Sequence, residues 1–258
     1  MNVLPFLHHS FVSKLNLDID IENNLVFLPQ VTSKGKPMES KNLQELNNLK
    51  TIKKEEISKI IDLIFSVNKT IIGKPRDRSS SADLILFQPN SYLMEWQMKF
   101  GDQKIGFSSI NNEVKKSFVM KDFKSVFILI AMNLSPELNS LIDEKSGFIK
   151  FDEGEYYAST SATYFCHYKE NELCKFLLPK GTTSTPKKED IKLDEKVKLI
   201  VPKNLQIIIL NKRGLQEFLG ISNYELLLNW NKTDRLQEIK KLVIDAISQI
   251  SPKKKFTI

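Results

Sequence analysis

The sequence predicts an α/β protein with a mixed central sheet flanked by helices, and three features lead to this prediction. Residues 55–69 carry isoleucines at the i, i+3, i+4 and i+7 positions of one buried helical stripe. Two apolar runs flank the turn sequence at 88–91, Gln-Pro-Asn-Ser, as in a β-hairpin. Residues 125–132 form a continuous apolar run, which is typical of a strand covered on both faces. A helix expected between the hairpin and this run makes a strand–helix–strand crossover.

The first part of the chain is mixed in character, and we expect residues 1–50 to form an N-terminal extension. Within it, residues 24–29 favour a short strand and residues 33–40 a polar loop. Residues 70–73 begin another strand, and the charged segment 74–79 connects that strand to the hairpin.

After the hairpin, Ser108 or Ser109 is expected to cap a helix that runs to Phe118. Residues 134–142 predict a shorter helix that opens at Ser135, because a serine followed by proline suits the N-cap and the first helical position. The remaining elements are an aromatic-rich insertion at 146–180 with strand or short helical pieces, an exposed loop at 181–198, a strand at 205–210, a short helix at 214–219 and an amphipathic helix at 234–250.

Composition points to a globular protein with an anionic partner. The 258 residues are 41% hydrophobic and 27% charged, which is ordinary, and 38 Lys plus Arg give a formal net charge of +7. Such an excess favours nucleic acid first and a membrane surface second. Two cysteines imply no disulfide framework and fit a reducing compartment. Without an apolar run of transmembrane length or a secretory signal, we expect an intracellular protein, nuclear or cytoplasmic, with no membrane partner.

The second strand of the hairpin, residues 92–99, alternates between apolar and polar side chains. Because strand side chains point to alternate faces, Glu95, Gln97 and Lys99 share one face and the bulky apolar side chains share the other. The apolar face should be packed, while Asp83 of the partner strand lies behind the polar face. Converging carboxylates on adjacent strands are what a divalent metal site needs.

The order of these elements resembles the PD-(D/E)XK nuclease superfamily, which includes type II restriction enzymes and Holliday-junction resolvases. The resemblance rests on a helix with an early Glu, a strand, Asp83 on a second strand, Glu95-Trp-Gln97 on a third, and then a helix and a strand. It covers residues 55–132. The Glu-x-Gln-x-Lys form also resembles the nuclease-like domains of Crinkler-type effectors and of retrotransposon hot spot proteins.

The resemblance implies a restriction-endonuclease-like core within one α/β domain over residues 51–258. The aromatic-rich insertion would interrupt this domain, and its C-terminal strand and helices would occupy 199–252. The implied activity is hydrolysis of phosphodiester bonds with Mg²⁺ or Mn²⁺, with DNA favoured over RNA as the substrate. The oligomeric state is left open, with a homodimer among the options.

The resemblance implies that Asp83 and Glu95 are metal ligands and that the backbone carbonyl of Trp96 is a third. This fits Mg²⁺, which takes oxygen ligands and keeps several waters. A metal-bound water is the nucleophile in such hydrolysis. Gln97 stands where the family has lysine, as in some restriction enzymes, and a neutral amide orients water without supplying positive charge. Lys99, one pleat further along the same face, is the candidate to supply that charge.

Other residues have supporting roles in the resemblance. Glu56 or Glu55 on the first helix is the candidate outer-shell acid. Lys115 and Lys116 on the helix after the hairpin suit contacts with the phosphate backbone.

Two plainer interpretations stand beside the catalytic one. The same fold with Gln97 in place of lysine could be inactive and bind nucleic acid or a protein partner, as an effector or mobile-element product. Alternatively, Asp83 ends a turn and Glu95 faces solvent on an edge strand.

Two further groups have a structural and a functional interpretation. Cys166, His167 and Cys174 lack a fourth ligand at zinc-like spacing, which favours an ordinary buried cysteine pair. The aromatic side chains of 148–176 fit either a local core or a surface that stacks bases.

Overall fold

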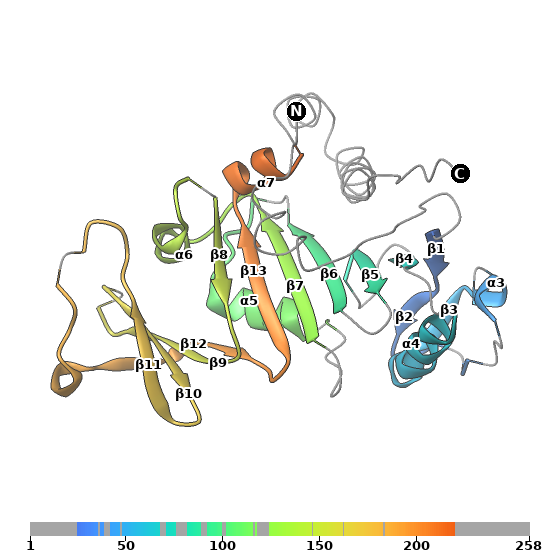
Figure 1. Ribbon diagram of the computed structural model, residues 1–258, viewed down its shortest axis with the longest axis horizontal. Coiled ribbons are helices and arrows are strands. Elements are labelled where there is room, and N and C mark those ends of the chain that lie inside the picture. Colours follow the sequence, from blue (N-terminus) through green and yellow to red (C-terminus); the bar gives the residue numbers. More distant parts are fainter. Residues whose placement is uncertain are drawn as a thin grey trace, which may run out of the picture. The chain divides into compact units, whose positions relative to one another are not determined.

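The computed structural model shows a mixed α/β protein with several sheets and few helices (Figure 1). The part of the chain that it describes comprises residues 25–35, 37–38, 42–46, 48–67, 71–75, 82–88, 92–99, 102–115, 117, 124–145, 147–161, 163–182 and 184–219. The chain divides into two compact units, one formed by residues 1–97 with 215–258 and the other by residues 98–214. Among the described helices, none has the length and apolar character to cross a membrane.

Four strands pair side by side along the first unit, in the order β1, β4, β5 and β6. The parallel pair joins β1 (Leu25–Leu28) to β4 (Ile71–Pro75), and β4 pairs antiparallel with β5 (Leu84–Gln88). The hairpin is completed by β6 (Tyr92–Lys99), which is antiparallel to β5. The predicted hairpin and the strand predicted at 24–29 are therefore confirmed.

The first unit also contains several elements that lie before the hairpin in the sequence. They comprise β2 (Gln30–Thr32) paired in parallel with β3 (Thr51–Lys53), the short helix α3 (Leu43–Leu46), a 3₁₀ turn η2 (Lys54–Glu56) and helix α4 (Ile57–Ser66). The predicted stripe of α4 is confirmed, since its isoleucines at 57, 60, 61 and 64 are all buried. The helix itself is shorter than predicted, because Glu55 and Glu56 lie in the 3₁₀ turn.

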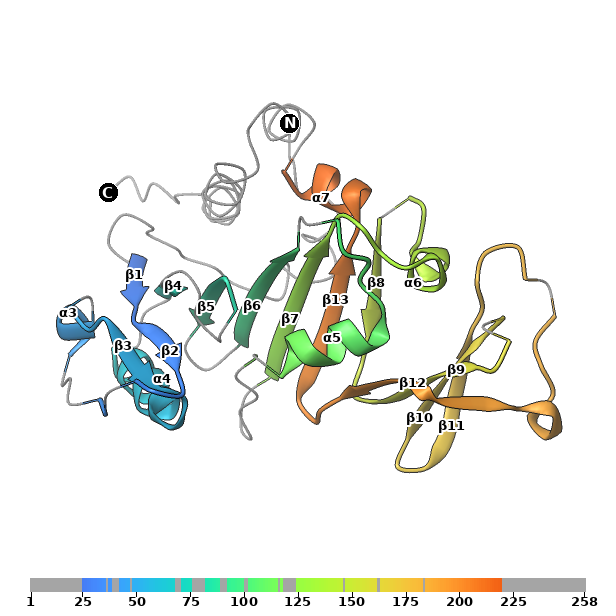
Figure 2. The ribbon, with the colours of Figure 1, turned by 180° about the vertical axis from the view of Figure 1, so that it is seen from behind.

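In the second unit, β13 (Leu205–Leu210) lies between β7 (Lys124–Ala131), to which it is parallel, and β8 (Phe148–Phe151), to which it is antiparallel. Both predicted apolar strands are confirmed, and their β-branched residues suit positions buried on both faces. Helix α5 (Phe107–Val114) lies across one face of these strands (Figure 1; Figure 2).

Two short helices complete this description. They are α6 (Pro136–Leu141), where Ser135 Oγ accepts from the N–H of Leu138 as predicted, and α7 (Lys212–Leu219).

The aromatic-rich insertion forms an antiparallel sheet of its own. Its strands, in the spatial order β11, β10, β9 and β12, are Glu172–Leu177, Phe165–Lys169, Gly154–Ser159 and Leu193–Val201. The exposed loop predicted at 181–198 is wrong over its last part, where β12 begins. As the edge strand of this sheet, β12 carries several charged residues, and lysines are common on edge strands.

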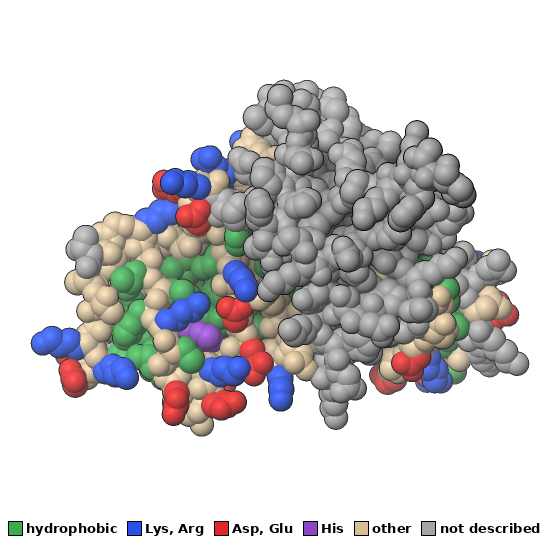
Figure 3. All heavy atoms as spheres, in the orientation of Figure 1, with side chains coloured by type: hydrophobic (Ala, Val, Ile, Leu, Met, Phe, Trp, Pro, Cys, Tyr) green, Lys and Arg blue, Asp and Glu red, His purple; other side chains and the backbone are tan. Residues whose placement is uncertain are grey.

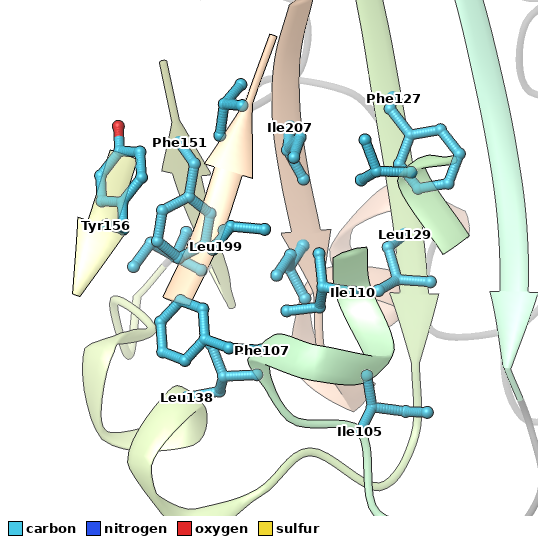
Figure 4. Packing of buried hydrophobic residues seen from close by; sticks show 14 of the residues in the cluster. Ile105, Phe107, Ile110, Phe127, Leu129, Leu138, Phe151, Tyr156, Leu199 and Ile207 are labelled. Carbon is cyan, nitrogen blue, oxygen red and sulfur yellow. The ribbon is translucent and has the colours of Figure 1, made fainter. Parts of the chain in front are cut away.

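The core of the second unit joins both of its sheets through α5 (Figure 4). Phe107 packs edge-on against Phe151, with ring centroids 5.9 Å apart, and tilted against Phe165 of the small sheet at 5.1 Å. Ile110, one turn further along α5, is fully buried in the same cluster. The predicted serine cap of this helix is wrong, since the N-cap is Gly106 and makes no side-chain hydrogen bond.

Helix α5 also holds the edge of the small sheet. The amide of Asn111 donates to the carbonyl of Lys198 and accepts from the N–H of Ile200, both in β12. An amide side chain thus occupies the place of a neighbouring strand, which satisfies two backbone groups of an edge strand.

The helices in the described ranges are fewer than the predicted flanking layers require, and the restriction-endonuclease-like arrangement stays a prediction. The helix predicted at 234–250 lies outside the described residues, as does Phe118, the predicted end of α5.

Replacement of Asn111 by alanine should lower the free energy of unfolding by about 1–3 kcal/mol, because two backbone groups of β12 lose their partner. Urea denaturation followed by circular dichroism measures the change. The matched control is Asn112→Ala, since Asn112 is exposed on the same helix and should shift stability by no more than about 0.5 kcal/mol. Equal transition midpoints for the two variants would contradict this role of Asn111.

Candidate functional site

The register of the β5–β6 hairpin determines which polar side chains share a face. Leu84 pairs with Trp96 and Ile85 pairs with Glu95. One position before the ladder, the N–H of Asp83 donates to the carbonyl of Trp96 at 2.9 Å. The paired ladder ends at Leu84, and this bond holds Asp83 beside the Trp96–Gln97 peptide. On β6, Glu95 and Gln97 are two residues apart and therefore share one face of the strand.

Asp83 and Gln97 are joined by a hydrogen bond. The amide nitrogen Nε2 of Gln97 donates to Asp83 Oδ2 at 2.8 Å. Gln97 is only 5% exposed, and its other polar atom, Oε1, is buried with no hydrogen-bond partner in the described ranges. The structure therefore brings together Asp83 and Gln97 of the predicted site, and the amide contacts a carboxylate directly.

The polar face of β6 is buried as completely as its apolar face. Glu95 is 0% exposed, compared with 2% for Trp96 and 6% for Met94 on the opposite face. The interpretation in which Glu95 faces solvent is therefore wrong. Burial of a carboxyl group is costly unless hydrogen bonds or an opposite charge compensate for it, so such groups are often found at functional positions.

The backbone carbonyl of Trp96, a predicted metal ligand, already accepts the hydrogen bond from Asp83. A carbonyl oxygen has a second lone pair, so this bond leaves one coordination position. The indole Nε1 of Trp96 is buried on the opposite face and has no hydrogen-bond partner among the described residues.

Lys99 is held by an acid of the second unit. Its Nζ lies 2.9 Å from Glu113 Oε1 on α5, and the two side chains are 32% and 12% exposed. This ion pair holds Lys99, the residue predicted to supply positive charge at the site, against Glu113.

Glu56 is occupied by local contacts. Lys59 Nζ donates to Glu56 Oε2 at 2.6 Å and the N–H of Met38 donates to the same oxygen at 3.1 Å. Both hydrogen bonds lower the pKa of the Glu56 carboxyl, and the bond from Lys59 has the larger effect. They give Glu56 a structural function at the start of α4; an outer-shell role stays a prediction.

Of the two lysines predicted to contact phosphate, Lys115 is exposed immediately after α5, as such a contact requires. Lys116 lies outside the described residues.

Oxygen atoms are the ligands that this hairpin offers. Within the described ranges, no three His, Cys, Asp or Glu side chains gather closely enough to share a metal ion. A cation at Asp83 and Glu95 would therefore need ligands of another kind, and the nearby groups are the Gln97 amide and the Trp96 carbonyl. This all-oxygen set fits Mg²⁺ or Mn²⁺ rather than a softer metal.

A second buried polar group, not anticipated from the sequence, lies in the small sheet. The ring of His167 stacks on that of Tyr156, with centroids 4.3 Å apart and planes 5° apart. His167 Nε2 is 3.0 Å from the carbonyl of Glu153, while Nδ1 is buried without a partner. The cross-strand pairing of these two residues positions the stack, and this non-local pairing has no local sequence signal.

The two cysteines do not form a metal site with His167. Cys166 is fully buried, and burial raises the pKa of its thiol to about 11. Cys174 is exposed on β11. The predicted buried pair is thus correct for Cys166 and wrong for Cys174.

Most of the aromatic side chains in the insertion contact one another. Tyr157 meets Tyr168 edge-on at 5.8 Å, and Tyr164 meets Phe176 at 5.9 Å. Tyr156, Phe151 and other rings belong to the core cluster. The local-core interpretation is therefore confirmed for these core members.

Comparison of the chain with protein-family models, with curated proteins and with solved structures finds no match.

Alkylation of the native protein with iodoacetamide at neutral pH should modify one thiol, and alkylation in denaturant should modify two. The native reaction occurs at the exposed Cys174, because burial and the raised pKa keep the Cys166 thiol protonated and inaccessible. Mass spectrometry counts the modified sites. In the Cys174→Ser variant the native protein should remain unmodified; rapid modification of Cys166 would contradict its burial.

Proposed function

We propose that this protein hydrolyses phosphodiester bonds of DNA with the help of Mg²⁺ or Mn²⁺, as a nuclease of the PD-(D/E)XK type. The observation that carries the proposal is the buried polar face of β6, where Gln97 bonds Asp83 and Glu95 lies two residues from Gln97 on the same face of the strand. Acid, acid and amide on one face of an antiparallel hairpin follow the order expected from the resemblance.

Each residue of this face has a role in the proposal. Asp83 and Glu95 hold the cation, which when bound polarises the scissile phosphate and activates water. The amide of Gln97 fixes one carboxylate oxygen of Asp83, so that this side chain is oriented before substrate arrives. The burial of Glu95 removes competing water from its carboxylate, which strengthens its interaction with a cation.

Charge along the chain supports an anionic substrate that is bound outside the small sheet. Residues 153–201 contain eight Lys and eight Asp or Glu, whereas residues 202–258 contain ten Lys or Arg and five Asp or Glu. On the face shown in Figure 3, basic and acidic side chains are interspersed over the described residues. The excess positive charge thus comes from other segments, including the C-terminal one.

The ion pair between Lys99 and Glu113 favours a second candidate, a binding module without catalysis. With Lys99 neutralised by Glu113 and the neutral Gln97 in the family's lysine position, neither residue supplies free positive charge for a developing transition state. Such a module would bind nucleic acid through its basic segments alone.

Purified wild-type protein should nick supercoiled plasmid in the presence of Mg²⁺ or Mn²⁺ but not of EDTA. Asp83→Asn and Glu95→Gln should each reduce the rate by about 100-fold or more, because each removes an anionic ligand of the cation. Agarose gels quantify the conversion to open circles.

The matched control for these substitutions is Asp152→Asn, since Asp152 also accepts from a glutamine amide, that of Gln206, but lies in the second unit. It should retain wild-type activity. Cleavage by Asp83→Asn at the wild-type rate would refute the catalytic assignment.

The binding-module candidate makes a separate prediction. DNA affinity, measured by fluorescence anisotropy, should fall steeply with salt and remain the same with Mg²⁺ or EDTA, because it depends on contacts with phosphates. Absence of plasmid nicking combined with this behaviour would favour the module over the nuclease; affinity that requires Mg²⁺ would count against it.

A further inference from the structure

The buried oxygen of Gln97 is the least satisfied acceptor on the polar face of the hairpin. Its side chain is 95% buried, and Oε1 has no hydrogen-bond donor in the part of the chain that the structure describes. Buried carbonyl oxygens are nearly always paired, and an exception often marks the place of a water or an ion.

The orientation of this amide is set by Asp83. If the two ends of the amide were exchanged, Oε1 would face the carboxylate oxygen Oδ2, and two acceptors would repel each other. The observed bond of 2.8 Å from Nε2 to Oδ2 therefore keeps Oε1 as the free acceptor. An amide anchored in this way presents its oxygen without further loss of side-chain freedom.

We propose that Gln97 Oε1 binds the divalent cation directly, together with Asp83 and Glu95. The inference rests on the proposed function for the presence of a cation, but it changes the role of Gln97 from a group that orients water to a metal ligand. Two observations support it: Oε1 is buried and unpaired within the part of the chain that the structure describes, and the bond to Asp83 fixes the amide with this oxygen as the free acceptor.

This role also explains why glutamine fits a buried position beside the carboxylate of Asp83. An amide supplies a hard oxygen ligand without adding a third negative charge, and its N–H group compensates Asp83 at the same time. A lysine at position 97 would place an ammonium group where the proposal requires a cation ligand.

The test is Mn²⁺ binding to the full-length protein, measured by isothermal titration calorimetry and by the loss of the free Mn²⁺ signal in electron paramagnetic resonance. Gln97→Met, which keeps the length of the side chain but removes both polar atoms, should weaken binding about 10-fold or more. Gln97→Glu, which keeps an oxygen ligand and adds charge, should bind at least as tightly as the wild type. The matched control, Gln206→Met, breaks a similar Gln–Asp bond in the second unit and should leave Mn²⁺ affinity unchanged.

The outcomes separate this inference from the proposed function. If Mn²⁺ binding depends on Gln97 but the protein does not cut plasmid, the ligand role is supported and the nuclease activity is refuted. Plasmid cleavage with equal Mn²⁺ affinity in wild type and Gln97→Met would overturn the ligand role and leave the nuclease standing. If Gln97→Met fails to fold by circular dichroism, Gln97→Glu decides, and a 10-fold loss of affinity in that variant would overturn the inference. No Mn²⁺ binding by the wild type would overturn it as well.

Discussion

The antiparallel register of β5 against β6 is the constraint on which the candidate site depends. A slip of one residue in this pairing would move Asp83 away from Gln97 and turn the side chains of one strand to the other face of the hairpin. The register is held by tight packing on both faces, where the apolar Trp96 side and the polar Glu95 side are equally buried. The same pairing that packs the hairpin therefore also positions its carboxylates.

Burial gives the polar face its chemical character. A carboxylate, an amide and a second carboxylate in a water-poor environment interact strongly with a small cation, whereas the same groups on an exposed strand would be solvated. Lys99, on the same strand as Glu95 and Gln97, forms an ion pair with Glu113 within the second unit, so its positive charge is neutralised. The proposed site therefore offers oxygen ligands, and its two carboxylates would favour a cation over an anion.

Much of this fold could be predicted from the periodicity of apolar residues along the sequence, whereas the candidate site could be predicted from it only in part. The isoleucine stripe of α4 and the apolar strands β7 and β13 could be predicted because each signal is local. The burial of Glu95 and the partner of Lys99 could not, because both depend on elements that pack from elsewhere in the chain. The hairpin brings Asp83 close to Gln97, but their hydrogen bond could not be predicted from strand pairing alone, because the paired ladder ends at Leu84.

The central claim is that Asp83, Glu95 and Gln97 bind one divalent cation, and a crystal structure of the protein soaked in Mn²⁺ tests it most directly. The account predicts one anomalous difference peak on the polar face of the β5–β6 hairpin, with Gln97 Oε1 and both carboxylates at distances close to the roughly 2.1 Å of Mg–O bonds. A soaked crystal without such a peak there, or a peak bound only by residues outside this hairpin, would contradict it.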